Sequence, residues 1–139
     1  MTELTVRHVA GDHFAIDVHG HTVHIDQPVA DGGTDAAPTP TVLFVASLAG
    51  CVAFYARRYL ARHGIDTDGF EVNADYRMAP RPARVDAISI RITPPPALPA
   101  DRHDAFLAVA THCTVHNSLE QPPAVRIELG PARVACSAS

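Results

Sequence analysis

The side chains best suited to covalent chemistry in this sequence are its three cysteines, Cys51, Cys113 and Cys136. They are too few and too scattered for a disulfide framework, and none lies in a Cys-x-x-Cys pair, which excludes zinc ribbons and thioredoxin-type motifs. Cys51 lies in the apolar run "SLAGCVAFYA", where a free cysteine is most often a small core side chain. The other interpretation of Cys51 is a nucleophile held out of water, and the run alone leaves both open.

Cys113 is predicted at a break between two helices, in "ATHCTVHNSL". Unpaired backbone N–H groups at a helix start can stabilise a thiolate, so this position favours chemistry more than that of Cys51 does. Cys136 lies in the tail "ARVACSAS", and because chain termini are loosely held we expect no role for it in the chemistry.

Nine histidines raise the question of a metal site. In "HGHTVH" the strand period puts His19 and His21 on one face and His24 on the other, so three ligands cannot converge from that strand. In "HCTVH" His112 and His116 have a zinc-like spacing of four, but Cys113 occupies the position where a zinc protease needs its glutamate. We therefore expect exposed polar histidines, with no metal and no cofactor.

A cysteine hydrolase would combine Cys51 with His116 and Asn117. Neighbouring helical residues point about 100° apart, so this histidine and asparagine would not line up as base and orienting group. The "DGG" stretch lacks the Lys and Ser/Thr of a phosphate-binding loop. Neither hydrolase nor nucleotide chemistry is favoured.

The elements that position these residues are predicted to follow the order βββ-α-ββ-αα-β, an α+β fold in a single domain over residues 1–139. Period-two alternation predicts strands, and helical patterns joined to capping signals predict helices. The strands are expected over 3–9, 13–20, 21–26, 70–78, 85–92 and 124–130, and the helices over 41–63, 101–113 and 114–120.

The long helix is expected to start at Thr39 or Thr41 around Pro40 and to end at Gly64, and the later helix to be capped by Asp101. From Val42 to Ala56 the long helix is apolar on all sides, which requires burial on all sides. One small domain cannot cover such a helix, so the pattern predicts an obligate homodimer.

Charge and composition narrow the class of protein further. The net charge is −4 and no run of Lys or Arg is present, which argues against nucleic-acid and membrane-surface partners. The N-terminal residues lack a signal-peptide pattern, and the longest apolar run is shorter than the ~18 residues that span a bilayer. We expect a cytoplasmic protein.

Two longer stretches resemble the two cysteine motifs of the OsmC/Ohr family. They are "DQPVADGGTDAAPTPTVLFVASLAGC", which ends at Cys51, and "ATHCTVHNSL", which contains Cys113. The two cysteines are 62 residues apart (113 − 51), in the family order, with the predicted β-hairpin between them. The resemblance extends over about residues 12 to 129 and is closest to the uncharacterised OsmC-like branch.

This resemblance implies an intertwined homodimer in which antiparallel sheets wrap two long central helices. It also implies a peroxidase that reduces organic hydroperoxides in oxidative-stress defence, with Cys51 as the peroxidatic and Cys113 as the resolving thiol, recycled by an external thiol reductant. The alternative is a non-catalytic small-molecule binding protein on the same fold, with both cysteines lining its pocket.

The sequence departs from the family pattern at three positions. Thr41 stands where the well-studied enzymes have a glutamate, ten residues before the cysteine, and Thr114 replaces the usual proline after the second cysteine. The loop before the long helix has no arginine, and Arg7 is the only arginine before Arg57. Because a buried thiol without a neighbouring cation tends to stay protonated, we expect a modest rate of peroxide reduction.

Overall fold

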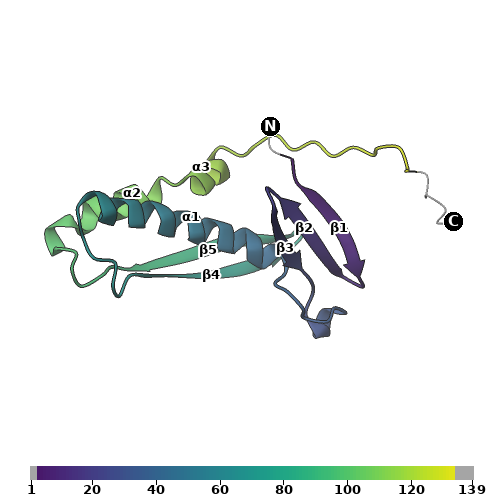
Figure 1. The fold of residues 1–139 in the computed structure, drawn as a ribbon, viewed down its shortest axis with the longest axis horizontal. Helices are drawn as coiled ribbons and strands as arrows, with labels where there is room; N and C mark the ends of the chain where they lie inside the picture. The colour runs from purple at the N-terminus through teal and green to yellow at the C-terminus, as the bar shows by residue number, and fades with distance from the viewer. Residues whose placement is uncertain (1–2, 134–139) are drawn as a thin grey trace.

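The computed structural model describes residues 3–133 and has a mixed α+β architecture with two antiparallel sheets and three α-helices (Figure 1). Short 3-10 helices at Val29–Asp31 and Ala100–Arg102 precede α1 and α2. The elements are β1 (Thr5–Ala10), β2 (His13–Val18), β3 (His21–Ile25), α1 (Pro40–Arg62), β4 (Glu71–Pro80), β5 (Ala83–Thr93), α2 (His103–Thr111) and α3 (Thr114–Glu120).

The first three strands form an antiparallel meander in the order β1-β2-β3, as the alternation predicted. Its second turn is the pair His19–Gly20, whose φ angles are 49° and 76°. Positive φ at both positions gives a two-residue hairpin whose twist matches that of the strands. In Figure 1 this sheet lies beyond the N-terminal end of α1, beside the helix rather than under it.

Helix α1 begins and ends at local signals. The Thr39 side chain accepts a hydrogen bond from the Val42 N–H at 3.1 Å, and Pro40 takes the first helical position. The helix runs to Arg62, and Gly64 follows with a φ of 63°. A left-handed residue here is unstrained only as glycine, so the chain leaves the helix at this point. The predicted bounds are confirmed to within one residue.

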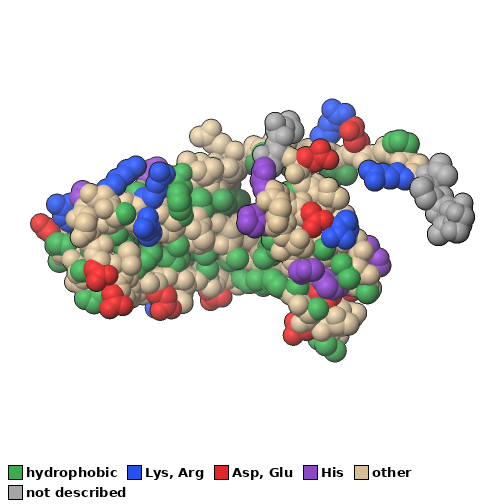
Figure 2. All heavy atoms as spheres, in the orientation of Figure 1, with side chains coloured by type: hydrophobic (Ala, Val, Ile, Leu, Met, Phe, Trp, Pro, Cys, Tyr) green, Lys and Arg blue, Asp and Glu red, His purple; other side chains and the backbone are tan. Residues whose placement is uncertain are grey.

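One copy of the chain does not cover the apolar circumference of α1. Val42, Phe44 and Phe54 are exposed at different points around the helix, and Figure 2 shows hydrophobic side chains reaching the surface across the middle of the molecule. By length and composition alone α1 could span a membrane. One face of α1 packs on the chain's own core. The burial on all sides that the sequence predicts is therefore absent from the single copy.

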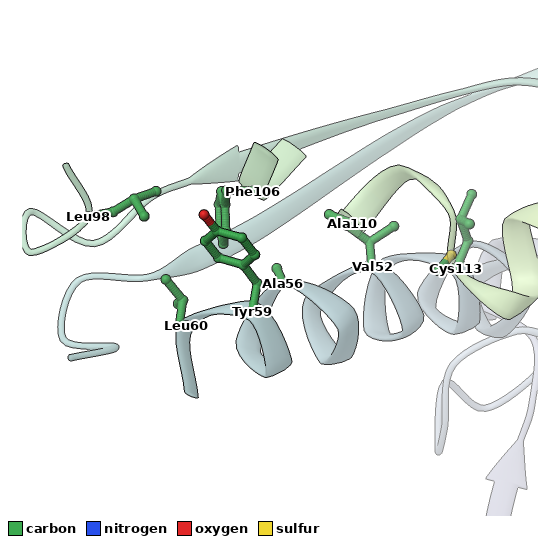
Figure 3. Close-up of a cluster of buried hydrophobic side chains, with 9 residues drawn as sticks. Val52, Ala56, Tyr59, Leu60, Leu98, Phe106, Ala110 and Cys113 are labelled. Atoms are coloured by element: carbon green, nitrogen blue, oxygen red, sulfur yellow. The ribbon is translucent and has the colours of Figure 1, made fainter. Parts of the chain in front are cut away.

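The core lies where α1 crosses the β4–β5 hairpin and runs beside α2 (Figures 1 and 3). Tyr59 of α1 packs edge-on against Phe106 of α2, with ring centroids 5.7 Å apart, and Phe70 approaches the same ring at 6.2 Å. The buried cluster comprises Leu48, Val52, Ala56, Tyr59, Leu60, Leu98, Phe106, Ala110 and Cys113. Through this cluster the segment that contains Cys113 is fixed against α1.

A buried carboxylate closes the loop between β3 and α1. Asp26 accepts hydrogen bonds from the Gln27 N–H at 2.7 Å, the Thr34 hydroxyl at 2.7 Å and the Ala36 N–H at 3.0 Å. The backbone donor of Ala36, followed by Thr34 and Gln27, lowers the pKa of Asp26 to about 2. Gly33 fits this loop because a Cβ there would collide with the Gln27 carbonyl.

The strand expected over 124–130 is absent, and that prediction was wrong. Residues 122–133 form no strand, and the alternating Val125, Ile127 and Leu129 are 78%, 92% and 100% exposed. In Figure 1 this segment leaves α3 and runs away from the body of the molecule. The alternation is that of a half-buried strand, but no strand among residues 3–133 pairs with it.

The expected cap of α2 was also wrong. The chain first makes the 3-10 turn Ala100–Arg102, so Arg102 rather than Asp101 takes the cap position, and it makes no side-chain cap. The tight turn comes first because "PPPALPA" feeds directly into the helix and Pro99 fixes the backbone before it. The third helix, predicted over 114–120, is confirmed at those bounds.

Candidate functional site

Cys113 lies in an extended backbone conformation immediately before α3, with φ −79° and ψ 157°. Its sulfur accepts a hydrogen bond from the His116 N–H at 3.4 Å, so a thiol occupies the capping position that Ser, Thr, Asp or Asn usually takes. The residue is completely buried. Figure 3 shows it at the end of the core cluster, against α1.

Cys51 lies on α1 and is partly exposed. One helical turn later, Tyr55 extends from the same side of α1 and its hydroxyl hydrogen-bonds to the Thr114 hydroxyl at 2.8 Å. This bond fixes the first residue of α3 against α1, directly beside Cys113. Tyr55 was missed by the sequence reasoning, although its position four residues after Cys51 was a usable signal.

The fold places Cys51 close to Cys113, because Cys51 packs against the buried cluster that contains Cys113. Burial is the largest cause that raises the pKa of Cys113, and a side-chain hydrogen bond with Cys51 raises it further, against a lowering by the His116 N–H. Both cysteines are reduced in this structure. At neutral pH the buried Cys113 is therefore held as a neutral thiol, and the partly exposed Cys51 is the one that a dissolved molecule can reach.

The ring of His116 is held away from the role of a general base. Its Nδ1 donates to the Thr111 carbonyl at 2.6 Å, and its Nε2 lies 3.2 Å from a Glu120 carboxylate oxygen. The histidine contacts Cys113 through its backbone and not through its ring. The arrangement gives no support to a hydrolase built from Cys51, His116 and Asn117.

The histidines do not assemble into a metal centre in the described part of the chain. His112 ends α2, where its Nδ1 donates to the Ala108 carbonyl at 2.7 Å, whereas His116 lies in α3. The spacing of four therefore spans a break between two helices. His13 and His24 approach each other at 2.9 Å, but no group of three or more metal-ligating side chains occurs within residues 3–133.

The positions where the sequence departs from the family motifs lie as follows. Thr41 is in the first turn of α1, and Thr114 makes the bond to Tyr55. Arg7 lies on β1 and pairs at 2.7 Å with Asp17 of β2, a bond that raises the pKa of the arginine and lowers that of the aspartate. In the single copy this ion pair therefore holds the Arg7 side chain against the β1–β3 sheet. Cys136 lies outside the described residues.

An apolar cleft of about 190 Å³ lies between α1, β5 and the α2–α3 segment. It is bounded on the α1 side by Val52, the neighbour of Cys51, and on the other side by Ala110 and His116, which flank Cys113 in the chain. The lining residues are Leu48, Val52, Ile88, Ile90, Ile92, Leu107, Ala110, Thr111 and His116. Such a surface suits an alkyl or aryl group better than a small polar solute.

The sequence profile of the family described as OsmC-like protein matches residues 32–128, which include both cysteines of the site. This chain belongs to the OsmC-like family. The resemblance inferred from the two cysteine motifs is thereby confirmed, and so is the α+β fold that it implied. None of the curated proteins matches the sequence at a significant level.

Solved structures share the OsmC-like fold over most of the chain. One is a protein from Psychrobacter arcticus named for osmotic stress induction and a detoxification response, with 27% identity, a TM-score of 0.77, and coverage of 85% of this chain and 88% of the other. An organic hydroperoxide resistance protein OsmC from Legionella pneumophila has 17% identity and a TM-score of 0.65, with 86% and 88% covered.

A third structure is an organic hydroperoxide resistance protein from Vibrio cholerae with captopril bound in one of its active sites. It has 19% identity and a TM-score of 0.62, with 88% of this chain and 85% of the other covered. Some structural neighbours of this OsmC-like protein are thus named for resistance to organic hydroperoxides. At these identities the likeness establishes the fold, and the chemistry of the present chain has to be argued from its own residues.

Proposed function

We propose that this OsmC-like protein is a thiol-dependent peroxidase that reduces organic hydroperoxides through Cys51 and Cys113, in defence against oxidative stress. The observation that carries the proposal is the proximity of the two thiols in one cluster, with Cys51 partly exposed and Cys113 buried. The two cysteines are 62 positions apart in the chain (113 − 51). Core packing alone would not require two thiols at this contact.

In the first step the Cys51 thiolate attacks the terminal oxygen of the hydroperoxide. The O–O bond breaks, the substrate leaves as an alkoxide that takes up a proton to become the alcohol, and Cys51 becomes a sulfenic acid. Cys51 is assigned this role because it is the more accessible of the two thiols.

In the second step Cys113 attacks the sulfenic sulfur of Cys51, a disulfide forms and water leaves. Two equivalents of an external thiol then reduce the disulfide and leave as their own disulfide, which restores both cysteines. The buried position of Cys113 keeps it away from peroxide while it waits for the sulfenate. No metal or organic cofactor is needed for this cycle.

The apolar cleft between α1, β5 and the α2–α3 segment supports organic hydroperoxides over hydrogen peroxide. Burial of an alkyl or aryl group contributes roughly 25 cal/mol per Å² of apolar surface, and hydrogen peroxide offers no such surface. The walls of the cleft, which include Leu48, Val52 and Ile90, would receive that group.

We further propose that the working form is a homodimer in the cytoplasm, without nucleic-acid or membrane partners. The support for the dimer is the exposed apolar side chains of α1 together with the exposed alternation over 124–130. A reducing compartment suits the proposed cycle, since an external thiol has to reduce the disulfide after each turnover.

The test is a stopped-flow assay of cumene hydroperoxide consumption, carried out in a Cys136→Ser background so that only two thiols are counted. Cys51→Ser is expected to abolish consumption. Cys113→Ser is expected to consume about one equivalent and then stall at sulfenic or sulfinic acid, because no partner thiol traps the sulfenate. Retention of full turnover by Cys51→Ser would refute the assignment.

The second candidate is a non-catalytic small-molecule binding protein, favoured by the same apolar cleft. Thiol titration separates the two functions. A loss of two thiols per chain after one equivalent of organic hydroperoxide is expected of the peroxidase, and no loss is expected of the binding protein.

A further inference from the structure

A second groove runs along the other flank of α1, between that helix and α2. Its volume is about 410 Å³, within the range of small-molecule sites, and in the single copy it is open to solvent. The α1 side is formed by Tyr55, Arg58 and Arg62, and the α2 side by Ala108, Val109 and His112. It shares no lining residue with the apolar cleft between α1, β5 and the α2–α3 segment.

The groove carries positive charge that the protein does not neutralise. No carboxylate in the described part of the chain forms an ion pair with Arg58 or Arg62. Figure 2 shows arginine side chains gathered over the end of the molecule that holds α1 and α2. Two guanidinium groups on one wall of a groove favour an anionic ligand there.

Two further observations describe how the groove would hold that anion. The Arg58 guanidinium lies over the Phe54 ring, 5.1 Å from its centroid, so this cation is partly ordered before any ligand binds. The His112 ring uses Nδ1 to donate to the Ala108 carbonyl, and its Nε2 makes no hydrogen bond to residues 3–133. Two guanidinium groups and one free ring nitrogen therefore border the same groove.

The remaining walls are apolar, and they lead toward the cysteines. Ala108 and Val109 line the groove together with Tyr55, and Tyr55 lies one helical turn from Cys51. Arg62 follows Cys51 by eleven positions on the same helix, which corresponds to about 16 Å along its axis. The ligand should therefore combine an anionic head with an extended apolar tail.

We propose that this groove binds amphipathic carboxylates, with the head at Arg58, Arg62 and His112 and the tail over Ala108, Val109 and Tyr55. A carboxylate matches the planar guanidinium in a two-bond pairing. A single negative charge is favoured over a phosphate dianion because the two arginines lie near the C-terminal end of α1, where the helix dipole opposes concentrated negative charge. The site is defined without reference to peroxide chemistry.

The proposal is tested by calorimetric titration with decanoate, kept below its micellar concentration, into the Cys51→Ser protein. Saturable binding is expected, and the double variant Arg58→Gln/Arg62→Gln should weaken it at least tenfold. Arg57→Gln is the matched control: it removes the same charge from the neighbouring exposed position, which does not line the groove, and should leave binding within twofold. Ala108→Glu, which introduces a carboxylate into the groove, should weaken binding as much as the double variant does.

Ligand variants identify the head group. Decanol and decyltrimethylammonium should bind at least tenfold more weakly than decanoate, and decyl phosphate no more tightly. The proposal is overturned if decanoate fails to bind, if decanol binds equally well, if Arg57→Gln weakens binding as much as the double variant, or if decyl phosphate binds markedly better. Because Cys51 is absent from the titrated protein, the outcome is independent of whether the chain is a peroxidase.

Discussion

Oxidation of the proposed cysteine pair should stabilise the folded protein strongly. A disulfide between Cys51 and Cys113 closes a loop of 62 residues (113 − 51). In the chain-entropy treatment a loop of that length removes enough freedom from the unfolded chain to stabilise the fold by about 4 kcal/mol. A small loss has to be subtracted, because the Cys113 sulfur that caps α3 by accepting the His116 N–H becomes a poorer acceptor once it is part of a disulfide.

The loss of a helix cap costs about 1 kcal/mol, so a net gain of about 3 kcal/mol is expected. The measurement is equilibrium urea unfolding at one fixed protein concentration, with protein treated with one equivalent of cumene hydroperoxide compared with protein kept in reductant. Mass spectrometry of the same samples should find the oxidised chain lighter by the mass of two hydrogen atoms, because disulfide formation removes one hydrogen from each thiol.

Cys113→Ser is the control, because it keeps a hydroxyl at the cap of α3 and cannot form the bridge. The same peroxide treatment should leave its unfolding midpoint unchanged. The reasoning would be refuted by an oxidised wild-type protein that is no more stable than the reduced one, or by an equal gain in the variant. The second result would place the stabilisation at a site other than this cysteine pair.

Four further outcomes are expected. Asp26→Asn should lower the unfolding temperature at pH 7 and remove the acid dependence between pH 4 and 2, since a carboxyl with a folded-state pKa of about 2 contributes stability above its ordinary pKa and loses it as pH falls. Phe106→Ala should cost about 3–5 kcal/mol in chemical unfolding, because its ring joins α2 to the core. Tyr55→Phe should cost about 1 kcal/mol and slow disulfide closure in a rapid-quench assay, whereas Tyr76→Phe, whose hydroxyl makes no hydrogen bond within residues 3–133, should do neither. Truncation after Gln121 should shift sedimentation from dimer to monomer, and an unchanged dimer would exclude residues 122–139 from the interface.

Local signals made much of the fold predictable. Helix α1 has a capping threonine, a proline at its first position and a glycine after its end, each acting within a few residues, and its bounds were found from them. The prediction of a strand over 124–130 was wrong because an alternating pattern indicates only that one face of the segment is apolar. It does not report whether a neighbouring strand exists in the same chain.

The site was less accessible to sequence reasoning than the fold was. The proximity of Cys51 and Cys113 was expected from the family motifs and not from their spacing in the sequence. Whether residues so far apart in the chain come close depends on how α1 and α2 pack. The bond from Tyr55 to Thr114 and the charged groove beside α2 depend on the same packing. The shell around Asp26 also escaped notice, since its donors come from a loop without any periodic pattern.

The exposed alternating segment over 124–130 has a consequence for handling the protein. Its unpaired backbone and its row of apolar side chains, Val125, Ile127 and Leu129, form the kind of free edge that templates aggregation. If a second copy normally shields this edge, the fraction of chains that display it grows as the solution becomes more dilute. Dilution, which protects most proteins from precipitation, would then shorten the shelf life of this one, and concentrated stocks would keep best.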